Sequence, residues 1–283
     1  MEKITLKVEK SDKLLKFLEG SLSNYKYSAL EKALRNRDII CNSNRVKENI
    51  DVQKGDEITI FLNPNSQKKL YDVFYEDQDI IVFNKRQGIE VIDGDFNIAS
   101  DYKAQTGIDI FAIHRIDRNT MGLVLFVKNT LAKETLINYF QRHYVIKNYY
   151  AVICGDPQKN ATLNSYLTKD SEKSEVKIFD KKVQNSVKIT TTYSLIKSCG
   201  KLSLLDVEIN AGKTHQIRAH LAHFGLFILG DEKYGDNKIN KKFKQTKQLL
   251  QAYKITFHIP NGEKFSYLNN IKFEQELDKK LCL

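Results

Sequence analysis

The sequence contains no run of apolar residues that approaches the ~20 needed for a helix to span a bilayer. Its start, Met1 to Ile4, lacks the apolar stretch of a secretory signal peptide. Both absences predict a protein that is cytoplasmic and does not associate with a membrane. No internal repeat stands out either.

Cysteine is sparse as well. The four cysteines lie far apart in the sequence and form no C-x-x-C pair; they are Cys41, Cys154, Cys199 and Cys282. This spacing predicts neither a disulfide framework nor a zinc site. We therefore expect buried free thiols.

The size and charge of the chain limit its number of domains and the kind of partner it binds. It has 283 residues, 41% hydrophobic and 28% charged, which is enough for one large domain and a small one with packed cores. The formal net charge is +10, and the pI is about 9.2. Such an excess of positive charge favours a polyanionic partner. Charge alone does not distinguish RNA from DNA or from an acidic membrane surface.

Residues 1–62 have the pattern of a small independent domain. Alternating apolar residues at the start predict a half-buried strand. Two helices are expected next, the first capped by Ser11 and the second opened by a capping box at Ser28. Lys32 and Arg35 lie on the flank of the second helix, away from its apolar stripe. A hairpin and a closing strand complete the unit.

A polar segment containing a proline, residues 63–70, is typical of a linker, and residues 71–283 then form the large domain. Strands are expected within this domain at 79–84, 123–127, 145–153 and 204–209, with helices at 130–141 and from Thr214 to Gly225. An antiparallel meander is expected over residues 161–196.

One segment of the large domain, His114–Gly122, reads His-Arg-Ile-Asp-Arg-Asn-Thr-Met-Gly and precedes a buried strand. It places the carboxylate of Asp117 between Arg115 and Arg118 on a loop at the mouth of that strand. Loops held by a rigid scaffold often carry catalytic groups. From residue types alone, a turn in which Asp117 pairs with a neighbouring arginine is the simpler interpretation.

The strand at 145–153 carries a second group of candidates. A period of two residues places Lys147, Tyr149 and Ala151 on one face. Ordinary sheet packing is the simpler interpretation of a tyrosine in such a strand.

The helix that follows Ala211 carries a third group. Gly212 and Lys213 directly before its N-terminus suit an anion. His215 and Arg218 are three residues apart and therefore share a face of the helix.

Three histidines in this region, His215, His220 and His223, invite comparison with a metal site. No acidic residue accompanies them at ligand spacing. We therefore predict structural or RNA-facing histidines and no bound metal.

Taken in order, these motifs resemble those of the RluA-type pseudouridine synthases. The His-Arg-Ile-Asp segment followed by Thr-x-Gly is similar to the family signature, with Met121 where the family usually has serine. Lys85-x-x-Gly, Lys-x-Tyr-x-Ala at Tyr149, Gly-Lys-Thr-His-Gln-Ile-Arg ending at Arg218 and Gly-Asp-x-x-Tyr-Gly starting at Gly230 follow in the family's order. The resemblance covers nearly the whole chain.

The resemblance implies an α+β fold with a mixed, mostly antiparallel sheet and flanking helices. It also implies the isomerisation of uridine in RNA to pseudouridine, without a metal, a redox step or another cofactor. In this reading Asp117 is catalytic and Arg218 pairs with it. Tyr149 stacks on the base or assists with the C5 proton. A base inside a duplex is out of reach, so the uridine must be flipped out.

The resemblance assigns RNA contacts to further residues. Arg115 would fill the space that the base leaves or hold a phosphate. The other RNA-binding residues expected in this domain are Lys85, Lys147, Lys213, His215 and Gln216. Simple exposure to solvent is the alternative for Lys85. Arg86, in place of the family's proline, predicts a less rigid loop. Lys213, in place of arginine, keeps the charge but loses the bidentate fork.

The N-terminal domain is similar to an S4 RNA-binding domain in the order of its elements and in the segments Lys13–Leu18 and Val52–Ile58. This similarity implies that Lys32 and Arg35 contact RNA. Relatives with an S4 domain commonly act on large-subunit ribosomal RNA, so ribosomal RNA is the expected substrate ahead of transfer RNA. We expect a monomer.

Two other functions are compatible with the sequence. A non-catalytic RNA-binding or ribosome-assembly protein could retain the scaffold, although the presence of Asp117, Tyr149 and Arg218 argues against it. A metal-dependent RNA hydrolase could use the histidines. Chemical labelling of pseudouridine would separate the first from an enzyme, and activity that resists chelators without strand cleavage would exclude the second.

Overall fold

The chain forms two compact units in the computed structural model, Met1–Lys69 (the N-terminal unit) and Leu70–Leu283 (the C-terminal unit). The structure describes residues 1–22, 24–66, 69–94, 97–170 and 175–283. Parts of two predicted segments lie outside the described residues: positions 67 and 68 of the linker and 171–174 of the meander. No helix in the described ranges is long and apolar enough to cross a membrane.

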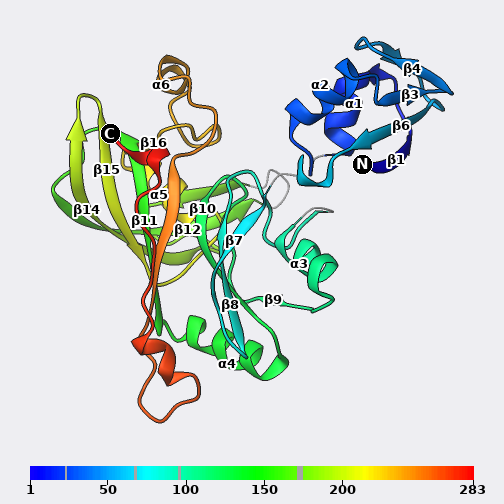
Figure 1. Ribbon diagram of the computed structural model, residues 1–283. Coiled ribbons are helices and arrows are strands. Elements are labelled where there is room, and N and C mark those ends of the chain that lie inside the picture. Colours follow the sequence, from blue (N-terminus) through cyan, green and yellow to red (C-terminus); the bar gives the residue numbers. More distant parts are fainter. Residues whose placement is uncertain (23, 67–68, 95–96, 171–174) are drawn as a thin grey trace. The chain divides into compact units, whose positions relative to one another are not determined.

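The N-terminal unit packs two helices, α1 (Leu14–Ser21) and α2 (Tyr27–Arg35), against a sheet with the strand order β1-β6-β3-β4 (Figure 1). The sheet strands are β1 (Glu2–Lys7), β3 (Ile39–Cys41), β4 (Asn44–Val46) and β6 (Glu57–Leu62). The short elements are β2 (Asp12–Lys13), β5 (Asp51–Val52) and η1 (Pro64–Ser66). Buried side chains from both helices and the sheet give this unit its own apolar core.

Neither predicted helix cap in this unit is used. The hydroxyl of Ser11 donates to Gln53 instead of capping α1. Asn49 takes its place, because its Oδ1 accepts the N–H of Leu15 at 2.9 Å. Ser28 lies inside α2, which has no side-chain cap. The cap of α1 thus comes from a residue that is distant in sequence, and a local motif does not reveal such a partner.

One large sheet forms the C-terminal unit, with the main strand order β13-β12-β14-β15-β11-β17-β10-β8-β7 (Figure 1). These strands are β7 (Tyr71–Glu76), β8 (Ile80–Lys85), β10 (Met121–Val127), β11 (Val145–Cys154), β12 (Asn160–Asp170), β13 (Glu175–Phe179), β14 (Val187–Cys199), β15 (Leu202–Ile209) and β17 (Leu250–Phe257). Short strands at its sides are β9 (Phe111–Ala112), β16 (Phe227–Ile228) and β18 (Phe273–Glu274). Among the strands that the structure describes, β10 and β17 are the pair that runs parallel. The prediction of a mixed, mostly antiparallel α+β fold is confirmed.

Helices cover the faces and ends of this sheet. They are α3 (Ile98–Thr106), α4 (Thr130–Gln141), α5 (Gln216–His223), α6 (Asn237–Lys242), η2 (Ser266–Asn270) and η3 (Lys279–Leu281). The predicted helix at 130–141 is confirmed, and the side chain of Asn129 caps it. The predicted Thr214 cap is wrong. His215 is the residue before α5, its φ is +51°, and no side chain caps the helix.

Strand β10 is buried along its whole length because apolar layers lie on both faces of the sheet. Val124 and Phe126 join a core that includes residues of α3 and α5. Leu123 and Leu125 join a second core that includes residues of α4. A strand covered on both sides reads as a continuous hydrophobic run. This arrangement explains the unbroken apolar sequence that follows the Asp117 loop.

The expectation of buried thiols holds for two of the four cysteines. Cys41 and Cys154 are buried, whereas Cys199 and Cys282 are exposed. Cys199 lies at the end of β14, and Cys282 follows η3. Both positions lie at the end of an element or directly after one.

Candidate active site

Asp117 lies on the loop between β9 and β10, and contacts from two directions hold this loop. The Nζ of Lys85 donates to the carbonyl oxygen of Arg118 at 2.9 Å. The amide of Gln248 donates to the hydroxyl of Thr120 at 2.7 Å. The loop directly after the carboxylate is therefore held by two segments that are remote in sequence.

Gly122, the second residue of β10, lies at a position that only glycine can occupy. Its φ is +111°, and a Cβ there would lie 2.1 Å from the carbonyl oxygen of Ala252 on β17. A side chain is excluded both by the close approach of β17 and by the backbone conformation. The glycine of the Thr-x-Gly motif is thus explained by the parallel pairing of β10 with β17.

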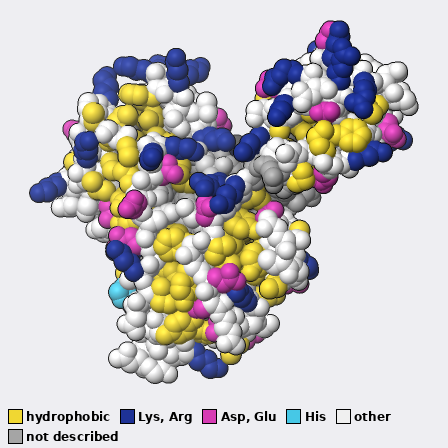
Figure 2. All heavy atoms as spheres, in the orientation of Figure 1, with side chains coloured by type: hydrophobic (Ala, Val, Ile, Leu, Met, Phe, Trp, Pro, Cys, Tyr) yellow, Lys and Arg dark blue, Asp and Glu magenta, His cyan; other side chains and the backbone are white. Residues whose placement is uncertain are grey.

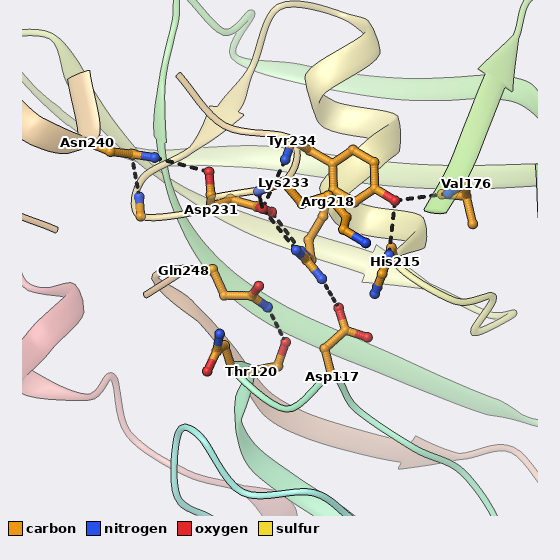
Figure 3. Close-up of polar contacts among 12 residues, drawn as sticks. Asp117, Thr120, Val176, His215, Arg218, Asp231, Lys233, Tyr234, Asn240 and Gln248 are labelled. Carbon is orange, nitrogen blue, oxygen red and sulfur yellow. Dashed lines mark hydrogen bonds and ion pairs between the residues drawn. The ribbon is translucent and has the colours of Figure 1, made fainter. Parts of the chain in front are cut away.

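The guanidinium of Arg218 bridges two carboxylates (Figure 3). Its Nη1 donates to Oδ2 of Asp117 at 2.8 Å. Its Nε and Nη2 donate to the two oxygens of Asp231 at 2.6 and 2.9 Å. The fork of Arg218 is therefore held on one side by Asp231 and presents a single nitrogen to Asp117.

Asp231 is a buried anchor for this arrangement, with only 1% of its surface exposed. Burial acts to raise its pKa, but the hydrogen bonds and charge of Arg218 and the N–H donors of Lys233 and Tyr234 lower the pKa overall. Burial likewise opposes the charge of Arg218, yet its two carboxylate partners raise its pKa above the ordinary value. Both shifts favour the ionised forms of Asp231 and Arg218.

Tyr234 connects this pair to His215. The guanidinium carbon of Arg218 lies 5.2 Å from the centre of the Tyr234 ring. The hydroxyl of Tyr234 accepts the N–H of Val176 and is hydrogen-bonded to Nδ1 of His215, each at 3.0 Å (Figure 3). Burial lowers the pKa of His215, which favours the neutral imidazole. Sequence reasoning gave Asp231 and Tyr234 no role, although both stand in the visible Gly-Asp-x-x-Tyr-Gly motif.

Tyr149 lies on the core-facing side of β11, as the two-residue period predicted, and is 6% exposed. Burial, and then the charge of Asp117, raise the pKa of its phenol above the ordinary value. The phenol therefore stays protonated near neutral pH.

Asp117, Tyr149 and Arg218 all line one cleft of about 1590 Å³ in the C-terminal unit. Five residues expected to contact RNA also line it: Arg115, Lys147, Lys213, His215 and Gln216. The three predicted catalytic side chains are thus brought together from the β9–β10 loop, β11 and α5. On the visible face of this unit, lysine side chains also gather over α6 (Figure 2).

Two residues expected to bind RNA have polar groups that form hydrogen bonds within the protein. Lys85 is fully buried, and its Nζ donates to the carbonyl oxygens of Arg86, Ile89 and Arg118. Burial lowers its pKa to about 7. Gln216 is 2% exposed and donates to the carbonyl oxygen of Thr190 at 3.0 Å. The RNA-binding prediction is wrong for Lys85, because backbone carbonyl oxygens surround its ammonium. For Gln216, which lines the cleft, it stays a prediction.

The remaining expected RNA contacts differ in their surroundings. Lys213 is exposed at the cleft, and Lys147 is buried in its wall. Arg115 is exposed and forms an ion pair with Asp93 at 2.8 Å. In the N-terminal unit, α2 carries two exposed basic residues, Lys32 and Arg35.

The departures from the family pattern are accommodated locally. Met121 packs in an apolar cluster that includes Leu281 near the end of the described chain. Arg86, in place of proline, pairs with Asp72, and its N–H donates to the carbonyl oxygen of Leu70 at 2.8 Å. Hydrogen bonds therefore hold the loop where a fixed proline φ is missing.

The histidines of α5 have separate partners. His220 is fully buried and hydrogen-bonded through Nδ1 to Thr191 at 2.9 Å. His223 pairs with Asp180 at 2.7 Å. Among the described residues, no group of three or more His, Cys, Asp or Glu side chains is arranged to hold a metal ion.

A protein-family model for RNA pseudouridylate synthase matches residues 79–223, the part of the chain that carries Asp117, Tyr149 and Arg218. The chain therefore belongs to the RNA pseudouridine synthase family, and it is an enzyme that isomerises uridine in RNA. The family predicted from the sequence is confirmed.

Known relatives agree over most of the chain. The ribosomal large subunit pseudouridine synthase C of Rickettsia typhi is 33% identical over 255 residues, which cover 81% of this chain and 82% of the relative. An uncharacterized RNA pseudouridine synthase of Mycoplasma pneumoniae, the MG370 homolog, is 32% identical over 295 residues, covering 92% and 89%. The solved structure of human RNA pseudouridylate synthase domain containing 4 has a TM-score of 0.59 at 20% identity, covering 74% of this chain and 89% of that one. This last likeness shows a shared fold.

Proposed function

We propose that the enzyme converts specific uridines of large-subunit ribosomal RNA to pseudouridine, with Asp117 as the essential catalytic carboxylate. The reaction breaks the bond between N1 and C1′ and forms one between C5 and C1′. The base loses a proton at C5 and gains one at N1, so substrate and product have the same mass. The observation that carries this proposal is the Asp117–Arg218 ion pair at 2.8 Å in a cleft that Tyr149 also lines.

Asp117 supplies the nucleophile or the stabilising carboxylate that the reaction needs at C1′ or C6. Its side chain is a quarter exposed to the cleft, so one oxygen can meet a ligand while Oδ2 accepts from Arg218. Arg218 cannot swing away, because Asp231 holds two of its nitrogens. The carboxylate is therefore aimed before the substrate arrives, and such preorganisation lowers the cost of reaching the transition state.

Tyr149 acts through its ring and its protonated hydroxyl. Its raised pKa disfavours a phenolate, so we do not assign it the role of a free base in the resting enzyme. A planar ring in the cleft wall suits stacking on an extruded uracil, which is worth ~1–3 kcal/mol per base.

Arg115 takes part in extrusion of the uridine. Its guanidinium is more than half exposed and pairs with the similarly exposed Asp93. An exposed ion pair contributes only ~0–1 kcal/mol, so RNA can exchange it for a phosphate or for the space that the base leaves.

The N-terminal unit is an S4-like RNA-binding module that brings the enzyme to its substrate. Its two helices on a four-stranded sheet, with Lys32 and Arg35 exposed on α2, support this role. Replacing both with alanine should weaken RNA binding and lower the salt slope by up to ~1.8 on duplex RNA, at ~0.9 per phosphate. An unchanged slope would contradict the role.

Mapping of pseudouridine tests the choice of substrate. Cells that lack the gene should lose pseudouridine at one or a few positions of large-subunit ribosomal RNA. The purified enzyme should restore the same positions on an unmodified transcript. Loss confined to transfer RNA would overturn the ribosomal assignment, and an unchanged map in all RNA would overturn the proposed function.

A further inference from the structure

Lys147 is a cation in the cleft wall that takes no part in the ion pairs of Asp117, Arg218 and Asp231. It lies on β11 two residues before Tyr149 and on the same face, so the two are ~6.6 Å apart along the strand. It is 4% exposed and lines the same cleft. Lys147 and Asp117 therefore line the same cleft.

Within the described residues, this ammonium makes no hydrogen bond or ion pair. It lies over the ring of Phe140, whose centre is 5.1 Å from Nζ. The ring of His114 is stacked on the same phenylalanine, and its Nε2 accepts the N–H of Leu125. Burial, and then the charge of Lys147, lower the pKa of His114 to about 3, so this imidazole is neutral. The surroundings of Lys147 supply no counter-charge.

A buried charge without a partner is unfavourable, because no interaction offsets the free energy lost when water is removed from it. Burial lowers the pKa of Lys147 to about 8, which leaves it mostly charged at neutral pH. The carboxylate of Asp117 is not its partner, since Arg218 already pairs with it. A ligand with its own negative charge would compensate the cost.

Gly212 keeps the ammonium open to the cleft. A Cβ at this position would lie 3.1 Å from Nζ of Lys147, so any side chain would crowd or cover it. Gly212 and the exposed Lys213 both line the cleft next to Lys147. The glycine leaves an opening that ends at a buried cation, with a second cation at its rim.

We propose that Lys147, with Gly212 and Lys213 around it, forms a subsite for one backbone phosphate next to the extruded uridine. This proposal depends on the proposed function in one respect, which is that RNA enters this cleft. It holds the phosphate in the ground state and in the transition state alike, so its effect falls on KM rather than kcat.

The first test replaces the charge at constant bulk. Lys147→Met should weaken binding of an oligouridylate about tenfold, equivalent to ~1.4 kcal/mol, and lower the salt slope by ~0.7, the value for one single-strand phosphate. Lys147→Arg should restore most of both. The melting temperature of Lys147→Met should stay equal or rise, because a buried charge is removed. Lys264→Met, at an exposed site outside the cleft, is the matched control.

The second test identifies which phosphate of the RNA pairs with Lys147. A stem-loop RNA containing the mapped uridine carries one neutral methylphosphonate at a time. At one linkage next to the uridine, the neutral group should weaken binding to the natural enzyme about tenfold but add no loss in Lys147→Met, which is the signature of a direct pair.

Three results would overturn the subsite. They are an unchanged affinity and salt slope, losses that add to Lys147→Met at every linkage, or a lower melting temperature that Lys147→Arg does not restore. The second result would assign Lys147 to the base, and the third to the fold. Binding and product are measured separately, so a chain that binds RNA through Lys147 but forms no pseudouridine would refute the proposed reaction and leave the subsite standing.

Discussion

Replacing Asp231 with asparagine tests whether Arg218 must be held from behind to serve Asp117. Asparagine keeps one acceptor oxygen but places an amide N–H₂ against the Nε of Arg218, where the oxygen now lies at 2.6 Å. One charge-assisted hydrogen bond is lost, and two donors face each other at a buried site. Hydrogen bonds to charged groups are worth ~1.5–3 kcal/mol, and breaking a buried pair costs ~3–5 kcal/mol. We expect the free energy of unfolding to fall by about 3 kcal/mol on this basis.

The same substitution should lower kcat by about 100-fold with little change in KM, because a displacement of ~1 Å in an aligned group has an effect of that order. Release of tritium from C5 of labelled uridine in RNA measures the rate, and thermal melting measures stability. Asp180→Asn is the control, since Asp180 pairs with His223 at the surface and its loss should cost less than ~1 kcal/mol. A kcat within about threefold of normal, at temperatures where the variant is folded, would refute the positioning role.

Three further outcomes follow from the site. Tyr149→Phe should keep RNA affinity within about threefold, whereas Tyr149→Ala should lose about tenfold because base stacking is worth ~1–3 kcal/mol; equal losses in both would contradict stacking. Lys85→Met should lower the free energy of unfolding by ~3 kcal/mol, since it leaves the carbonyl oxygens of Arg86 and Ile89 without their ammonium donor and removes one of the two donors to that of Arg118, and it should leave RNA affinity unchanged; a stable variant that binds RNA poorly would reverse our correction. The pKa of Lys147 is lowered to about 8, so the unfolded chain holds this proton up to higher pH and stability should rise with pH above about 8. The melting-temperature difference between the natural protein and Lys147→Met, followed from pH 7 to 10 (about the pKa window of a lysine), should shrink as pH rises, and a constant difference would contradict the shift.

Local sequence patterns predict helices and strands well where residues close in sequence determine them. The helix at 130–141 has its cap, Asn129, directly before it, and the strand at 145–153 follows a clear two-residue period. Caps supplied from elsewhere were not predictable. The N–H of Leu15 is satisfied by Asn49, and the residue before α5 adopts a left-handed conformation that no nearby polar residue announces.

The candidate site shows the same division. Motif order identified Asp117, Tyr149 and Arg218, and the fold brings these three to one cleft. The direction of a polar side chain depends on the acceptors around it, and these come from other segments. Lys85 was therefore read as an RNA contact although three carbonyl oxygens surround it. Asp231 was overlooked because its partner is 13 residues away and only the folded chain joins them.

The most direct measurement of the central claim is pseudouridine formation by Asp117→Asn under single-turnover conditions. Asparagine preserves the shape of the side chain but removes the charge that Arg218 contacts at 2.8 Å. We expect RNA binding within about threefold of normal, because substrate binding and chemistry use different groups here, and no tritium release above background. Pseudouridine formed at the normal rate by this variant would remove Asp117 from the chemistry and contradict the account.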